Sequence, residues 1–102
     1  MYTYRLMPSA VQDLQEIGDY IATQLNAPGS AAALLNDMQE AIEKACAFPM
    51  SLPAIQDELL QAKGYRKIIV KNYIVFVFPD PEAEILNVMR VMYHARNYLE
   101  EL

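Results

Sequence analysis

The stretch GYRKIIVKNYIVFVFPDPEAEILNVMRVMYHARNY, residues 64–98, decides the fold of this chain. Two short breaks, at 71–72 and 79–81, divide it into three runs rich in β-branched and aromatic residues. Such runs, separated by turn residues, are typical of neighbouring strands joined by tight turns. The stretch therefore predicts a three-stranded antiparallel meander, with strands at 65–70, 73–78 and 85–93.

The two breaks predict different turns. Asparagine tolerates a positive φ, so Asn72 is expected to provide the left-handed residue of a tight turn. Prolines lack the N–H that a strand ladder uses, so Pro79-Asp80-Pro81 is expected to lie outside both strands. The run 73–78 between the breaks is apolar at nearly every position. That composition is typical of a strand covered on both faces.

The preceding half of the chain predicts one strand and a first amphipathic helix. Residues 2–7 alternate polar and apolar side chains, and Pro8 ends the strand. Ser9 with Gln12 forms a capping-box pattern that opens a helix. Its apolar residues recur every three or four positions and make one stripe, with Asp13, Glu16 and Asp19 off it. The stripe consists of Val11, Leu14, Ile17, Ile21 and Leu25.

A break at 26–29 separates this helix from a second one, expected over 30–47. The short connection predicts an antiparallel hairpin of the two helices. Residues 50–63 read as a loop in which DELLQA, 57–62, forms a helical turn. The fold class is therefore α+β: a strand, a two-helix hairpin and a three-stranded antiparallel meander, with the helices packed on one sheet face.

Length and composition place the chain among small globular domains. With 102 residues, 54% of them hydrophobic, we expect a single domain over residues 1–102. No apolar run approaches the ~20 residues needed to span a bilayer, and the N-terminus does not resemble a secretory signal. Cys46 is the one cysteine and is expected to be a buried structural thiol. A cytoplasmic protein with no membrane contact is the prediction.

Charge is distributed unevenly around a net value of −5. Residues 1–62 contain two cationic and eight acidic side chains, whereas residues 63–98 contain six cationic and three acidic ones. The helical half is therefore acidic and the sheet half basic. The overall balance argues against direct, specific DNA binding and leaves room for a local basic face.

The polar residues of the last strand have structural interpretations. Arg90 stands among apolar residues, so we expect it to pair with an acidic residue of a helix. His94, at the strand end, suits either a proton shuttle or an exposed turn. One histidine and one cysteine make no metal-ligand set, and there is no glycine-rich phosphate loop. The sequence thus predicts no metal and no cofactor.

Several segments together resemble the RelE/ParE superfamily of toxins. They are AVQDLQEIGDYIATQL (10–25), AAALLNDMQEAIEKACAFP (31–49), GYRKIIVKNYIVFVF (64–78) and RVMYHARNY (90–98). The superfamily belongs to type II toxin–antitoxin systems, and its members are often labelled plasmid stabilisation proteins. RelE-type members cut mRNA in the ribosomal A site, whereas ParE-type members poison DNA gyrase. The resemblance implies a growth-inhibiting toxin with a cognate antitoxin as its partner, and gyrase or the ribosome as its target.

The resemblance also implies candidate site residues. RelE-like nucleases carry cations on the middle strands, an Arg or His at the end of the last strand and often a C-terminal Tyr. The matching residues here are Arg66, His94, Arg96 and Tyr98. Where many RelE-like proteins carry an Arg on the middle strand, this chain reads Tyr73-Ile74-Val75-Phe76. A central phosphate-binding cation is missing, which weighs against RNA cleavage.

Three hypotheses therefore remain from the sequence. The first is a toxin that acts by binding its target, with gyrase-type poisoning favoured. The second is a metal-independent, ribosome-dependent endoribonuclease, and the third is a non-toxic module that only binds an antitoxin. In each case we expect an antitoxin helix to dock on exposed apolar surface beside the first helix. The contact residues expected for that helix are Val11, Leu14, Ile21 and Leu25.

Overall fold

The computed structural model describes residues 1–94 of the chain. In chain order its elements are β1 (Thr3–Leu6), α1 (Pro8–Asp19), the π-helical turn η1 (Tyr20–Gln24), α2 (Pro28–Ala45), the 3-10 turn η2 (Pro49–Ser51), α3 (Glu58–Ala62), β2 (Arg66–Val70), β3 (Tyr73–Asp80) and β4 (Ile85–Tyr93). The predicted order of strand, helix hairpin and three-stranded meander is confirmed, as is the helical turn within 57–62.

The four strands form one mixed sheet in the order β1-β4-β3-β2. The meander β2-β3-β4 is antiparallel, and β1 runs parallel to β4. Thr3–Leu6 pairs with 85–88, whereas β4 continues to Tyr93. On the side of β4 that faces β1, no strand in the described part of the chain lies beside β4 past Val88. The second half of β4 therefore has an open edge.

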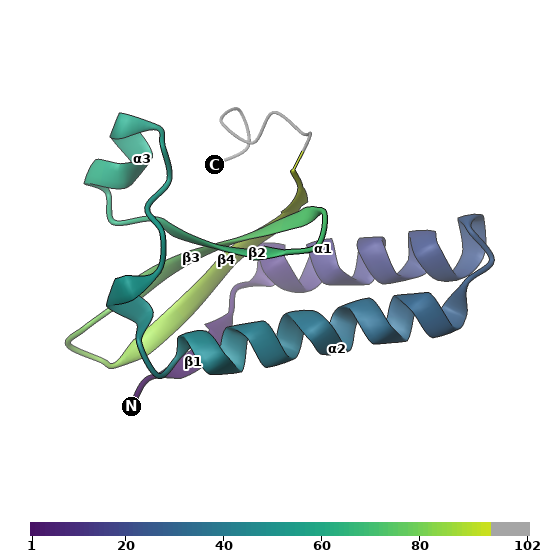
Figure 1. Ribbon diagram of the computed structural model, residues 1–102, viewed down its shortest axis with the longest axis horizontal. Helices are drawn as coiled ribbons and strands as arrows, with labels where there is room; N and C mark the ends of the chain where they lie inside the picture. The colour runs from purple at the N-terminus through teal and green to yellow at the C-terminus, as the bar shows by residue number, and fades with distance from the viewer. Residues whose placement is uncertain (95–102) are drawn as a thin grey trace.

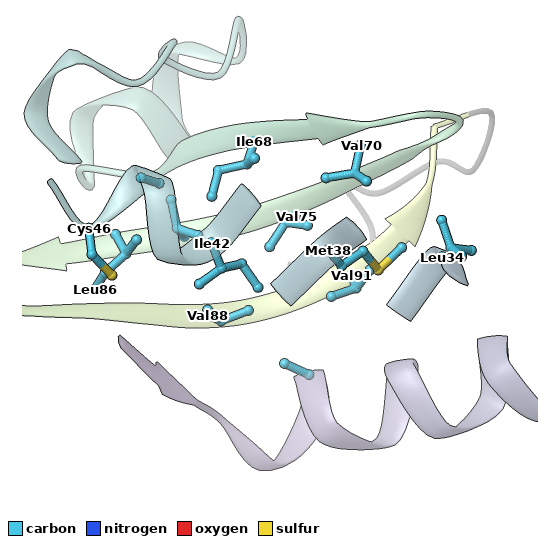
Figure 2. Packing of buried hydrophobic residues seen from close by; sticks show 13 residues of the cluster. Leu34, Met38, Ile42, Cys46, Ile68, Val70, Val75, Leu86, Val88 and Val91 are labelled. Atoms are coloured by element: carbon cyan, nitrogen blue, oxygen red, sulfur yellow. The ribbon is translucent and has the colours of Figure 1, made fainter. Parts of the chain in front are cut away.

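The long helices α1 and α2 lie antiparallel to each other on one face of the sheet (Figure 1). Between α2 and the sheet lies the larger core, in which Leu34, Met38 and Ile42 of α2 share one face because they are four positions apart. Figure 2 shows these side chains against those of β2, β3 and β4. The sheet contributes Ile68, Val70, Val75, Val77, Leu86, Val88 and Val91.

A smaller core lies on the second face of the sheet. Ile55 and Leu60, from the segment that contains α3, cover Phe76 of β3 and Met92 of β4. Thus β3 is buried on both faces, as its continuous apolar sequence predicts. The prediction that the helices pack on one face holds for α1 and α2, while the short α3 lies on the other side of the sheet (Figure 1).

The helix starts correct one local prediction. Both α1 and α2 begin with a proline, Pro8 and Pro28, and neither has a side-chain cap. Proline at the first helical position has its φ already set and lacks an N–H that would be unsatisfied there. The capping box proposed for Ser9 and Gln12 is therefore wrong. Gln12 instead donates to Glu16 along the helix surface, at 3.0 Å.

The two turns of the meander also differ from the prediction in detail. The tight turn at 71–72 is present, but the positive φ of 52° belongs to Lys71 and not to Asn72. Pro79 and Asp80 belong to β3, where they pair with Leu86 and Ile85. β2 pairs with β3 only as far as Val77, so Pro79 lies past the end of that ladder and its missing N–H breaks no β2 bond.

The helices described for residues 1–94 include none that is long and apolar enough to cross a lipid bilayer.

Candidate functional site

A buried carboxylate fixes α1 against the open edge of β4. Asp13 accepts hydrogen bonds from Arg90 Nε at 2.7 Å and from Arg90 Nη2 at 3.0 Å. Its Oδ2 also accepts the backbone N–H of Val91 at 2.9 Å. The carboxylate therefore takes the position of a neighbouring strand's carbonyl at this edge. The predicted pairing of Arg90 with an acidic helix residue is confirmed.

A groove of about 650 Å³ opens beside this contact. It lies between the end of α1, the η1 turn and the start of α2 on one side, and the β2–β3 turn and the end of β4 on the other. Its lining is mostly apolar and aromatic, with Asp13, Glu16 and Lys71 as charged members. The other lining residues are Ile17, Tyr20, Ile21, Leu25, Ser30, Leu34, Asn72, Tyr73, Val91, Met92 and Tyr93.

Three tyrosines gather in this groove. Tyr73 and Tyr93 lie opposite each other on β3 and β4, with ring centroids 5.7 Å apart. Tyr20, from η1, lines the same groove. Burial raises the pKa of Tyr73, and the nearby phenols of Tyr93 and Tyr20 raise it further. The phenol of Tyr73 is therefore a neutral hydrogen-bonding group at neutral pH.

His94 lies next to this cluster and is held by the β2–β3 turn. Its backbone N–H donates to the carbonyl of Asn72 at 2.9 Å, and its ring Nδ1 lies 3.1 Å from the same oxygen. The ring is exposed and lies 5.2 Å from that of Tyr93. Because the N–H of His94 points toward β3, the N–H of Tyr93 points the other way, toward the open edge.

Arg66 lies at the other end of β2. It pairs with Val77, whereas the residue before His94 pairs with Tyr73. Val77 lies four positions after Tyr73 along β3, which puts about 13 Å between the two pairs at ~3.3 Å per residue. The guanidinium of Arg66 donates to the carbonyl of Leu52 at 2.8 Å. The structure therefore does not bring Arg66 and His94 together, and Arg96 and Tyr98 lie outside the described residues.

The four residues expected to contact an antitoxin helix separate into two groups. Ile21 and Leu25 line the groove, and Leu25 is 56% exposed. Leu14 packs against the core on the inner side of α1. Val11 is 38% exposed and does not line the groove. The accessible apolar surface thus lies at the η1 end of the helix.

Comparison with known proteins places the chain in a family. The sequence profile described as ParE toxin of type II toxin-antitoxin system, parDE, matches residues 4–98. The chain belongs to this ParE toxin family. A comparison with curated protein sequences gave no match.

Two solved structures share the fold of this ParE-family chain. One is described as a chromosomal ParDE system from P. aeruginosa, with 16% sequence identity and a TM-score of 0.74 over 91% of this chain and 96% of that one. The other is a RelBE2 toxin–antitoxin complex from Mycobacterium tuberculosis, with 21% identity and a TM-score of 0.63 over 93% of each chain. The family match identifies this chain as a ParE-type toxin of a type II toxin–antitoxin system. The two structures show that its fold is shared with ParE and RelE proteins.

The residue that organises the groove of this ParE-type toxin was missed in the sequence. Asp13 lies off the predicted apolar stripe of the first helix, but its side chain is only 8% exposed. The spacing contains a signal that reveals this, because Ala10, Asp13 and Ile17 recur at intervals of three and four, as residues of one helix face do. Ala10 is fully buried, and Ile17 packs against the core.

The chemistry that the groove offers is that of a binding surface. Among residues 1–94 no group of three His, Cys, Asp or Glu side chains is arranged to hold a metal ion. The phenols provide donors and acceptors, and the aliphatic side chains of η1 provide apolar contact area. Such a mixture suits a protein segment with both apolar and polar groups.

Proposed function

We propose that this ParE-type toxin inhibits growth by binding DNA gyrase, and that it does not cleave RNA. The observation that supports this is the separation of Arg66 from His94 along the sheet. A metal-independent ribonuclease needs an acid, a base and cations around one phosphodiester. Arg66 is instead tied to the carbonyl of Leu52, and the middle strand carries Ile74 where many RelE-like proteins have an arginine.

We further propose that a cognate antitoxin neutralises the toxin by covering the groove between η1 and β4. Exposed apolar area at Leu25 and Tyr20 favours an apolar side of an antitoxin helix. The open edge of β4 offers the N–H of Tyr93 to an extended segment that follows such a helix. The proposed contact set is Ile17, Tyr20, Ile21, Leu25 and Tyr93, which moves the docking surface away from Val11.

Growth after induction tests the first proposal at the level of the cell. We expect induction of the chain alone to slow growth, and co-expression with the neighbouring antitoxin reading frame to restore it. Normal growth in both strains would show that the chain is not a toxin and would favour an antitoxin-binding module.

Two purified assays separate the possible targets. We expect the chain to inhibit supercoiling by DNA gyrase and to leave mRNA on purified ribosomes uncut. The variant His94→Ala should behave like the wild type in both assays. It should inhibit gyrase and should leave the mRNA uncut, because the wild type does not cleave mRNA either. Cleavage at A-site codons that disappears in His94→Ala or Arg66→Ala would overturn the proposal in favour of a ribonuclease.

A further inference from the structure

The second face of the sheet carries a pocket of about 520 Å³, far from the groove. It lies around the pair formed by Phe78 and Asn87, toward the start of β4, whereas the groove lies at the Tyr73–Tyr93 end. Side chains of β1, β3, β4 and the end of α3 contribute to it. Its lining consists of Arg5, Met7, Lys63, Tyr65, Phe78, Asn87 and Met89.

The guanidinium of Arg5 is held in place within this pocket. Its Nε and Nη2 donate to Oδ1 of Asn87 at 3.2 and 3.0 Å. The amide nitrogen of Asn87 donates to the carbonyl of Phe78 at 3.2 Å, which fixes the orientation of the amide. Asn87 is a buried polar residue, so its hydrogen-bonding capacity serves to position Arg5. Among residues 1–94 no hydrogen bond occupies Nη1 of Arg5, so this nitrogen can donate to a ligand.

The positive charge of the pocket has no acidic counterpart in the described residues. Neither Asp nor Glu lines it, and neither Arg5 nor Lys63 takes part in an ion pair within residues 1–94. Elsewhere in this range, Lys71 pairs with Asp37 at 3.1 Å. A positioned arginine and a second cation without a carboxylate between them make a site for an anionic group.

The remaining walls of the pocket are apolar. Tyr65 and Phe78 meet edge to face, with ring centroids 5.7 Å apart. Met7 and Met89 complete the lining with flexible thioethers, which adapt to the shape of a bound side chain. The ligand that fits therefore combines one anionic group with an aromatic or aliphatic one.

The charge of the whole chain distinguishes between classes of ligand. A net charge of −5 repels a polyanion such as a nucleic acid, since binding of that class depends on an extended positive surface. A protein segment brings a single carboxylate next to apolar side chains. Two cations around one apolar pocket match such a segment.

We propose that this pocket binds a segment of a partner protein in which a carboxylate stands beside an aromatic or aliphatic side chain. The proposal goes beyond the proposed function, because the pocket and the antitoxin groove lie on opposite faces and at opposite ends of the sheet. It gives the toxin a second attachment point that stays accessible when the groove is covered.

A small molecule with the same two groups tests the proposal on the full-length chain. N-acetyl-L-phenylalanine is titrated into ¹⁵N-labelled protein, and its neutral analogue N-acetyl-L-phenylalaninamide serves as the matched ligand control. We expect saturable amide shifts at Asn87 and Met89 in the millimolar range, with the neutral analogue at least about tenfold weaker because it lacks the charge-assisted bonds.

Variants assign the binding to the two cations. We expect Arg5→Gln and Lys63→Gln each to lower the affinity for N-acetyl-L-phenylalanine at least about fivefold. Lys71→Gln, at the other end of the sheet, should leave this affinity unchanged. Lys63 is exposed and follows α3, so its variant keeps the test valid even if Arg5→Gln fails to fold.

Three results would overturn the proposal. One is the absence of saturable shifts at millimolar probe, and another is equal binding of the charged and neutral analogues. The third is a short oligothymidylate that displaces the probe in an Arg5-dependent way and binds more tightly, which would assign the pocket to nucleic acid.

Discussion

At the scale of single residues, the carboxylate of Asp13 replaces a strand partner. It accepts two bonds from Arg90 and one from the Val91 amide while it is almost fully buried. We expect Asp13→Ala to lower the free energy of unfolding by about 3 kcal/mol, because it leaves a buried amide unsatisfied and removes a buried ion partner. Urea-induced unfolding followed by circular dichroism measures this change.

The matched control for this prediction is Asp37→Ala. Asp37 also pairs with a cation, Lys71, but the two side chains are 41% and 61% exposed. Solvent screening makes such pairs weak, so the expected loss is below about 0.5 kcal/mol. Equal losses in the two variants would show that the Asp13 contact stabilises the fold no more than a surface pair does.

Cys46 provides a residue-scale test of stability against pH. The residue is 3% exposed, and burial, with a smaller effect of Glu43, raises the pKa of its thiol above the ordinary value. The unfolded chain therefore releases the thiol proton at a lower pH than the folded chain does. We expect the free energy of unfolding of the wild type to fall as pH rises from the thiol pKa of the unfolded chain to the thiol pKa of the folded chain. The variant Cys46→Ala lacks the thiol and should not show this fall. Parallel pH profiles of wild type and variant, measured by urea unfolding, would contradict this.

The role of a residue could be predicted from the sequence where its chemistry allows only one kind of partner. An arginine in an apolar strand beneath an acidic helix needs an anionic partner, so the pairing of Arg90 was predictable. Which helix carboxylate would meet it was not, because that choice depends on how α1 is rotated about its axis against β4. The sequence contained the spacing of Ala10, Asp13 and Ile17, but the stripe of larger apolar residues masked it.

At the scale of elements, the first helix changes geometry where the groove begins. The sequence predicts one continuous helix to Leu25, but the structure changes to a π-helical turn over Tyr20–Gln24. The amide of Leu25 accordingly donates to the carbonyl of Tyr20, five residues back. π-helical turns are rare and often occur at functional sites. This turn directs Tyr20, Ile21 and Leu25 into the groove.

Leu25 and Val11 form a matched pair of exposed apolar residues on this helix. We expect Leu25→Asp to weaken antitoxin binding at least about tenfold, since an unpaired charge in a desolvated contact costs more than about 1.4 kcal/mol. Val11→Asp should leave the affinity nearly unchanged, because Val11 lies outside the groove. Isothermal titration of each variant with the antitoxin distinguishes them. A larger loss for Val11→Asp would return the docking surface to the start of α1.

The bounds of a helix or strand could be predicted where residues close to them in the sequence determine them. β4 spans Ile85–Tyr93 as expected, because charged and turn residues flank one apolar run. The length of β3 was underestimated, since the tolerance for Pro79 depends on where β2 ends and not on the sequence around it. The start of α1 differs from the prediction by two residues for a local reason, because Pro8 is the first helical residue and not only the end of the preceding strand.

At the scale of the whole molecule, the decisive contact joins the two ends of the sequence. β1 pairs with β4 across more than eighty residues, and the register Leu6↔Val88 determines how much of β4 stays open. Pairing of this kind depends on the packing of the helix hairpin between the two strands, so local patterns in the sequence did not reveal it. The groove and its open edge are consequences of that register.

The distribution of apolar surface predicts how the complex responds to salt. Leu25, Tyr20 and Tyr93 are each about half exposed, whereas Lys71 at the groove already pairs with Asp37. Burying even ~400 Å² of apolar area would contribute roughly 10 kcal/mol before association costs are subtracted. The affinity for the antitoxin should therefore come mainly from apolar contacts and should change by less than about fivefold between low and high salt, because screening acts on charges.

Calorimetric titrations from low to high salt measure this affinity. Lys67→Gln serves as a control that should bind the antitoxin as tightly as the wild type does. The prediction would be overturned by two results together: an affinity that falls steadily and strongly as salt rises, and a weaker affinity of Lys67→Gln than of the wild type at low salt. These results would show that the basic sheet residues hold the antitoxin.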